Sequence, residues 1–315
     1  MWECFKRKQV REIMTTKELL HDKSFRLSIL VTIGFLSVGI LFLTLGLADY
    51  NFALFLVMPL VLGFSVGSMT RLKWAYYGLV AGILTILIFL VAGGMEGLIC
   101  VLMALPIFIP LVFIGTLIAL LVRKKDRPPR SLHVHLAPLL IFIFVAPSEK
   151  YLFGDKVISE VRSEIILPYS AIDVYNSIKS VDTLIAEKPF LMKLDLPVPQ
   201  KCVLEKEEIG ALRTCYFDGG KIVERITELK PGEILKMDVV SYDLTGAKWL
   251  GFKEAIYTFE ETQANACKMV RITTYTSSLK PRFYWESLEK LGIEQEHEYV
   301  FRNLVRDLSL LEKND

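Results

Sequence analysis

Two cysteines in the C-terminal half have a spacing that could form a covalent bond. Cys202 and Cys215 flank a turn signal at Glu208–Gly210. A two-residue loop at 208–209, or a four-residue loop at 207–210, would place them directly opposite each other on adjacent antiparallel strands. Opposed residues there lie about 4.5–5.5 Å apart, which is within disulfide reach. We expect a disulfide, which requires an oxidising compartment. The alternative is two ordinary buried thiols.

One histidine is the main candidate for acid–base chemistry. His297 is the only histidine after residue 135, and it falls on the apolar stripe of a C-terminal helix, so it should face the interior of the domain. It could act as a general base. We favour a hydrogen-bonded core histidine, because no serine or cysteine nucleophile can be assigned near it. The five cysteines show no CxxC spacing, so we expect no metal site, and nothing suggests a cofactor.

Aromatic residues of the same half could line a pocket for an apolar ligand. Together with His297, the candidates for ligand contact are Trp249, Phe252, Tyr257, Tyr275, Tyr284, Trp285 and Phe301. The alternative is that these rings simply form a core. Glu164, Arg213 and Glu224 also fall in expected strands, but the sequence does not fix which face of the sheet they occupy.

These residues follow a half of the chain that is typical of membrane proteins. Of the 315 residues, 52% are hydrophobic, and the excess lies before residue 148. After a basic segment at 1–26, a transmembrane domain is expected at 27–147. A spanning helix needs about 20 apolar residues. We therefore expect about five spans, the last one short, at 27–47, 52–69, 74–92, 98–122 and 132–147.

The charges of the connecting loops predict the orientation of these spans. Basic residues occupy the N-terminal segment and the loops at 70–73 and 123–130, whereas the loops at 48–51 and 93–97 have no lysine or arginine. The positive-inside rule then predicts a cytoplasmic N-terminus. Five spans would place the C-terminal domain on the extracytoplasmic side. No charge lies in the middle of a span, which argues against a pump or transporter.

Two glycine motifs in the spans indicate close helix packing. Gly63–Gly67 and Gly78–Gly82 each fit GxxxG. Such faces let helices approach closely in lipid. They could serve packing within this bundle, which we favour, or the association of two copies in a homo-oligomer.

The C-terminal half has the patterns of an α+β domain. Residues 157–167 alternate in polarity as a strand does, and Ser170 is a plausible N-cap for a short helix at 171–178. A second short helix is expected at 181–187. Turn signals then separate six further strands, at 201–206, 212–217, 221–229, 234–242, 252–261 and 267–277. Helical periodicity begins at residue 282, with a break expected at Gly292.

Three segments of this half resemble the START-like superfamily, which includes polyketide cyclase/dehydrase-type domains. They are SEVRSEIILPYSAIDVYNSI, GALRTCYFDGGKIVERITELKPGEILKMDV and KPRFYWESLEKLGIEQEHEYVFRNL. The resemblance covers residues 157–311 and implies a helix-grip domain at 150–315. In that fold an antiparallel sheet wraps a long C-terminal helix, and a cavity between them holds an apolar ligand. The N-terminal half resembles membrane regions fused to such domains in bacteria.

These expectations together describe a multi-pass protein of the bacterial inner membrane. We expect its START-like domain to bind a membrane lipid or another apolar small molecule at the extracytoplasmic face. One alternative is an enzyme of cyclase, dehydratase or hydrolase type that uses the same cavity. The other is a non-catalytic interaction module whose cavity is filled by side chains. We favour binding over catalysis, and a net charge of +2 gives no case for a nucleic-acid partner.

Overall fold

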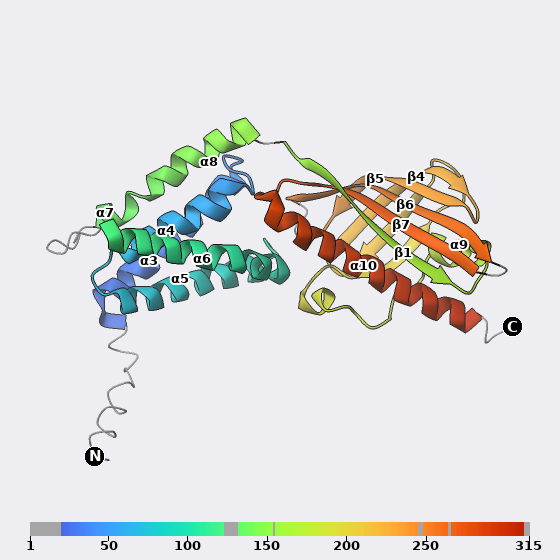
Figure 1. The fold of residues 1–315 in the computed structure, drawn as a ribbon, viewed down its shortest axis with the longest axis horizontal. Coiled ribbons are helices and arrows are strands. Elements are labelled where there is room, and N and C mark those ends of the chain that lie inside the picture. The colour runs from blue at the N-terminus through green and yellow to red at the C-terminus, as the bar shows by residue number, and fades with distance from the viewer. Residues whose placement is uncertain (1–19, 123–131, 154, 245–247, 264–265, 312–315) are drawn as a thin grey trace, which may run out of the picture. The chain divides into compact units, whose positions relative to one another are not determined.

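The chain forms two compact units, one built from apolar helices and one built around a sheet (Figure 1). The computed structural model describes residues 20–122, 132–153, 155–244, 248–263 and 266–311. The basic residues before position 20 and the basic loop at 123–130 lie outside the described residues.

Among the described residues, four helices are long and apolar enough to cross a membrane, and a fifth is shorter. In chain order the elements are α3 (Lys23–Thr44), η2 (Ala53–Val57), α4 (Met58–Gly67), α5 (Leu72–Ala92), α6 (Leu98–Val122), α7 (Leu132–Leu136) and α8 (Leu139–Phe153). The expectation of a multi-helix membrane region is confirmed. The number of candidate spans agrees roughly with the five expected from the sequence.

The short helix is not the one that the sequence predicted. The run expected at 132–147 continues through the turn between α7 and α8, giving 21 apolar residues from Leu132 to Leu152. The run expected at 52–69 instead has only five π-helical and ten α-helical residues. Its length is about 22 Å at ~1.5 Å per residue, which is less than the ~30 Å of a hydrocarbon core.

Both glycine motifs face other helices of this unit. A side chain at Gly67 would meet the Cα of Thr116 on α6 at 2.8 Å, and one at Gly82 would meet Thr32 on α3 at 2.8 Å. Hydrogen bonds accompany these close approaches, since Thr116 Oγ1 donates to the carbonyl of Gly63 at 3.1 Å. The glycines therefore serve packing within the bundle, as helices need when lipid supplies no hydrophobic driving force.

Polar contacts tie the helices together at the two ends of the bundle. At one end, which we call the Asp22 end, the Asp22 carboxylate caps α3 and pairs with Arg71 at 2.7 Å. Ser68 Oγ, at the C-cap of α4, lies 2.7 Å from Nδ1 of His135 on α7 at that end. The segments that precede α3, follow α4 and precede α7 therefore all lie at the Asp22 end of the bundle.

At the opposite end, which we call the Glu149 end, the carboxylate of Glu149 on α8 accepts the backbone N–H groups of Phe52 and Ala53 at 2.8 and 2.6 Å. Lys150 Nζ donates to the carbonyl of Gly46 at 2.6 Å. A negative group at a helix N-terminus satisfies donors that have no partner within the helix. The chain thus leaves α8 at the end of the bundle where the connection between α3 and α4 lies.

The second unit has the predicted helix-grip architecture. Seven antiparallel strands form one sheet in the order β1-β7-β6-β5-β4-β3-β2. They are β1 (Val157–Leu167), β2 (Pro199–Leu204), β3 (Leu212–Phe217), β4 (Gly220–Lys230), β5 (Ile234–Asp243), β6 (Leu250–Gln263) and β7 (Ala266–Ser277). The long helix α10 (Arg282–Leu311) crosses the sheet, and its buried residues include Ile293, His297 and Leu304 (Figure 1).

Two expected local features of this unit are wrong. No helix forms at 181–187, because Val181 instead pairs with Cys202 and extends the hydrogen bonding of β2. Gly292 does not interrupt α10, which is continuous over 30 residues. Gly292 is buried beside Leu196, so tertiary packing offsets the ~1 kcal/mol that glycine costs in a helix. The short helix α9 (Ala171–Lys179) does begin after Ser170, whose hydroxyl accepts the N–H of Asp173.

The glycine contacts predict a difference between two alanine variants. At Gly115 on α6 a methyl group would overlap the backbone carbonyl of Leu60, whereas at Gly34 on α3 it would meet nothing within 4 Å. We expect Gly115→Ala to destabilise the bundle by about 1–3 kcal/mol and Gly34→Ala to leave it unchanged or slightly more stable. Thermal unfolding of the full chain in detergent measures both. Equal midpoints for the two variants would contradict this packing.

Candidate functional site

The inward face of the sheet carries charged residues as well as apolar ones. Alternation along the strands turns Arg213 on β3, Glu224 on β4 and Arg271 on β7 toward the interior, and these residues are 3%, 7% and 9% exposed. Charged side chains are rarely buried this deeply unless they are paired. Their partners therefore define what the interior can do.

Arg213 has a protein acceptor at each of its three side-chain nitrogens. Its guanidinium donates to Glu224 at 2.8 Å and to the carbonyls of Lys179 and Ile178 at 3.0 and 3.2 Å. Burial opposes the charged form most strongly, yet the adjacent carboxylate of Glu224 holds the pKa of Arg213 above its usual value. This arginine is a structural cation that links β3, β4 and the end of α9.

Arg271 is paired less completely. Its Nη2 lies 2.8 Å from the carboxylate of Glu296 on α10. The guanidinium groups of Arg271 and Arg213 both lie over the ring of Tyr257, at 5.4 and 5.9 Å from its centroid. The Nε and Nη1 atoms of Arg271 are buried, and no residue in the described part of the chain accepts a hydrogen bond from either. Buried donors of this kind are normally satisfied by protein, water or ligand.

His297 lies beside this cluster and is completely buried. Its Nε2 is 2.8 Å from Oγ1 of Thr273, and its Nδ1 is 2.9 Å from Oγ of Ser163. Burial, and secondarily the charge of Arg271, lower the pKa of His297 to about 2. The imidazole is therefore neutral at ordinary pH, and both ring nitrogens have hydroxyl partners. This geometry suits a hydrogen-bonded core residue better than a general base.

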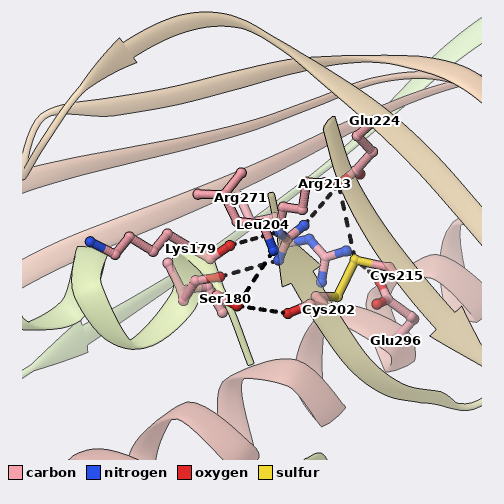
Figure 2. The surroundings of a disulfide bond; sticks show 10 residues. Lys179, Ser180, Cys202, Leu204, Arg213, Cys215, Glu224, Arg271 and Glu296 are labelled. Carbon is pink, nitrogen blue, oxygen red and sulfur yellow. Dashed lines mark hydrogen bonds and ion pairs between the residues drawn. A yellow bond between two sulfur atoms is a disulfide. The ribbon is translucent and has the colours of Figure 1, made fainter. Parts of the chain in front are cut away.

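A disulfide joins Cys202 and Cys215 next to this site, with their Cα atoms 4.0 Å apart. The two cysteines are a register pair of β2 and β3, and Arg213 pairs with Leu204 two residues along (Figure 2). Ser180 donates to the carbonyl of Cys202 at 3.1 Å. The cross-link therefore fixes the edge strand β2 to the strand that carries Arg213.

The aromatic residues predicted to contact a ligand fall into separate groups. Tyr257 and Phe301 belong to the main core of the unit, and Phe301 lies 6.4 Å from the His297 ring. Tyr275 packs in a smaller cluster with Val161 and Ile293, and Phe252 lies against that cluster. The remaining three lie elsewhere, since Tyr284 and Trp285 stack edge to face on the first turn of α10, and Trp249 precedes β6.

A second buried network surrounds Tyr275 rather than Arg271. Glu289 on α10 accepts from Tyr275 at 3.3 Å and from Arg282 at 2.9 Å. Burial, and next the charge of Glu289, raise the pKa of Tyr275 to about 12. The charges of Arg282 and Glu289 balance, and the tyrosine stays protonated. The hydrogen bonds of this network hold the start of α10 against the end of β7.

Sequence reasoning missed the residue that matters most, Arg271, and its partner Glu296. Arg271 lies between the buried Met269 and Thr273, so alternation along β7 could have placed it inward. Nothing in the local sequence identifies Glu296 as its partner, because the two residues lie on different elements. The sequence places Arg213 and Glu224 in strands, and the structure shows that they form a buried pair.

No family model matches the sequence, and no curated protein matches it. Among solved structures, the chain is similar to the Zhui aromatase/cyclase from a Streptomyces species, with 12% identity, coverage of 49% of this chain and 94% of that chain, and a TM-score of 0.36. It is also similar to a point mutant of norcoclaurine synthase from Thalictrum flavum, with 15% identity, 51% and 99% coverage, and a TM-score of 0.35. A protein from Thermus thermophilus gives 16% identity, 49% and 99% coverage, and a TM-score of 0.35. These distant likenesses assign no chemistry to this chain, and the helix-grip assignment rests on its own strand order and register.

The low pKa of His297 predicts how stability depends on pH. Because the folded state binds this proton less tightly than the unfolded state, whose histidine pKa is about 6.5, stability is lost as pH falls below that value. We expect the stability difference between wild type and His297→Gln to change by up to ~1.4 kcal/mol per pH unit below pH 6.5. Thermal unfolding of the full chain from pH 8 to 5 measures it, with the exposed His133→Gln as control. Parallel pH profiles for wild type and His297→Gln would contradict a buried neutral imidazole.

Proposed function

We propose that this chain is a multi-pass protein of the bacterial cytoplasmic membrane whose helix-grip domain binds an apolar molecule, such as a membrane lipid, on the extracytoplasmic side. The ligand would lie between the concave face of the sheet and α10. The domain would act by burying that molecule rather than by transforming it.

One observation carries the proposal for binding. Arg271 keeps two buried nitrogens that no described residue satisfies, although the neighbouring Arg213 has a partner at every nitrogen. An interaction module whose interior is filled only by its own side chains would leave these donors unbonded at a cost of about 1–3 kcal/mol. A bound molecule with an acceptor atom removes that cost, so the arrangement favours a ligand-binding interior.

The enzyme alternative has weaker support from the same residues. A general base needs a free lone pair and a pKa near the working pH. His297 has hydroxyl partners at both nitrogens, and burial lowers its pKa to about 2. Arg213 and Arg271 can orient or stabilise a bound group, but neither can take up a proton at ordinary pH. Binding is therefore the function that this geometry supports better.

The two ends of the bundle support an extracytoplasmic domain. Arg71 lies at the Asp22 end. The loop that contains Arg71, the N-terminal segment and the segment before α7 hold every basic residue of this half except Lys150. The positive-inside rule assigns that end to the cytoplasm. Glu149 and Lys150 lie at the Glu149 end, which the chain reaches as it leaves α8. The domain that follows would then be on the outer side.

One further feature agrees with this orientation, and a second is compatible with it. The Cys202–Cys215 disulfide persists in an oxidising compartment and is rare in the cytosol. The helix from Ala53 to Gly67 is short for a span, and a short span is accommodated by local thinning of the bilayer at modest cost. Tethering would also keep the domain at the surface from which a lipid ligand comes, which raises the effective ligand concentration.

Ligand binding predicts that an apolar molecule accompanies the purified chain. We expect mass spectrometry of organic extracts to find a molecule retained by the full chain, at about one per chain, and absent from a control chain that ends at Phe153. The control retains the bundle, so lipids held by the helices are subtracted. Identical extracts from the two chains would contradict a ligand in the sheet-containing domain.

The orientation predicts the side on which a C-terminal reporter is active. A phosphatase that works only outside the cytoplasm, fused after Asp315, should be active, and the same reporter fused after Lys73 should be inactive. In the same cells, thiol alkylation should modify Cys202 and Cys215 only after reduction. An inactive C-terminal fusion together with freely alkylated cysteines would place the domain in the cytoplasm.

A further inference from the structure

The inward face around Arg271 combines one incompletely bonded cation with apolar neighbours. Arg271 pairs across the sheet with Ser163 on β1 and Tyr257 on β6. Met269 on the same strand and Phe301 on α10 belong to the main apolar core, and both are less than 10% exposed. A molecule next to Arg271 would therefore meet Arg271 and its polar partners together with the apolar side chains of Met269 and Phe301.

The N–H donors of Arg271 determine which groups of a ligand this side chain can bind. A guanidinium has five N–H bonds, of which one sits on Nε and two on each terminal nitrogen. Only Nη2 has an acceptor, the carboxylate of Glu296, which leaves the three N–H bonds on Nε and Nη1 without one among the described residues. Arg213 has an acceptor at all three nitrogens, so the fold can satisfy a buried arginine here and does so at the neighbouring position.

The charge balance of the cluster selects among possible acceptors. Two guanidinium groups, on Arg213 and Arg271, face two carboxylates, on Glu224 and Glu296, each pair at 2.8 Å. The adjacent His297 is neutral, and Arg282 and Glu289 balance each other at 2.9 Å. An anionic group would add an uncompensated charge to this interior, which is expensive, whereas an uncharged oxygen would not.

We infer that the ligand of this domain is an uncharged apolar molecule with a carbonyl or hydroxyl oxygen, and that this oxygen accepts a hydrogen bond from Nε or Nη1 of Arg271. The inference rests on the proposed binding function and specifies its ligand class. Arg271 acts as the polar anchor, and the apolar remainder of the ligand lies along the core face near Met269 and Phe301. The carbonyl could belong to a glycerolipid ester or to a smaller ester or ketone.

Three probes of equal chain length test this assignment: methyl decanoate, decanoate and decane. Calorimetric titration of the full chain in one detergent at pH 7.5 gives the affinities. Wild type should bind methyl decanoate more tightly than decanoate. Arg271→Met should weaken methyl decanoate binding about tenfold or more, as expected for loss of a hydrogen bond to a charged group, and should leave decane binding unchanged. Arg225→Met, an exposed arginine of β4, is the matched control and should bind all three probes as wild type does.

A second variant keeps the inference testable if Arg271→Met does not fold. Glu296→Gln retains Arg271 and an acceptor for Nη2 but removes one negative charge from the cluster. We expect it to bind decanoate at least tenfold more tightly than wild type does. Unchanged decanoate binding would overturn the inference, as would wild-type affinity for decanoate that equals or exceeds that for methyl decanoate.

The outcomes separate this inference from the function on which it rests. Equal binding of all probes by wild type and Arg271→Met would refute the role of Arg271 and leave an apolar-ligand domain standing. No binding of any probe, with no co-purified molecule, would refute the proposed function itself. Uptake of dioleoylglycerol from nanodiscs by wild type would identify the source of the carbonyl as a glycerolipid. Binding of methyl decanoate alone would identify a smaller molecule.

Discussion

Pairing of buried charge is the constraint on which the soluble domain depends. Arg213 and Arg271 lie inside the curved sheet, and each needs a carboxylate and a ring face that only the folded arrangement provides. Removing one partner of such a pair typically costs about 3–5 kcal/mol, because the other charge is left buried and uncompensated. The pairs therefore tie β3 to β4 and β7 to α10 at one place. Of the two, Arg213 has a protein acceptor at every nitrogen and Arg271, among the described residues, at one, so the same constraint distinguishes a structural arginine from one that is available to a ligand.

The membrane unit obeys the corresponding rule for a medium without water. Backbone groups and charges at the ends of its helices have partners from other helices, as Glu149 provides for Phe52 and Ala53 and Asp22 provides for Arg71. Within the bundle, glycine and threonine let backbones approach closely and exchange hydrogen bonds. These contacts define which helix ends lie together. They therefore bear on which side of the membrane the following domain occupies.

Features that depend on local sequence could be predicted, and features that depend on distant partners could not. The alternation at 157–167 and the cap at Ser170 act over a few residues, so β1 and the start of α9 followed from them. The pairing of Cys202 with Cys215 has the predicted register, but β2 ends at Leu204 and β3 begins at Leu212, so the connection is longer than the two or four residues expected. Val181 escaped prediction because Cys202, 21 positions later, takes its backbone hydrogen bonds. Arg271 escaped because a charge between buried residues contradicts the usual inside–outside pattern until its partner is known. Glu296 supplies that partner from another element, and no periodicity connects the two.

A molecule that occupies the interior beside Arg271 is the feature on which the proposed function depends. A cryo-EM or crystal structure of the full chain purified from its own membrane, without added ligand, tests this most directly. We expect density for an elongated molecule between the sheet and α10, with an oxygen within about 3.2 Å of Nε or Nη1 of Arg271. Continuous side-chain packing around Arg271, with both nitrogens bonded to protein groups and no additional density, would contradict it.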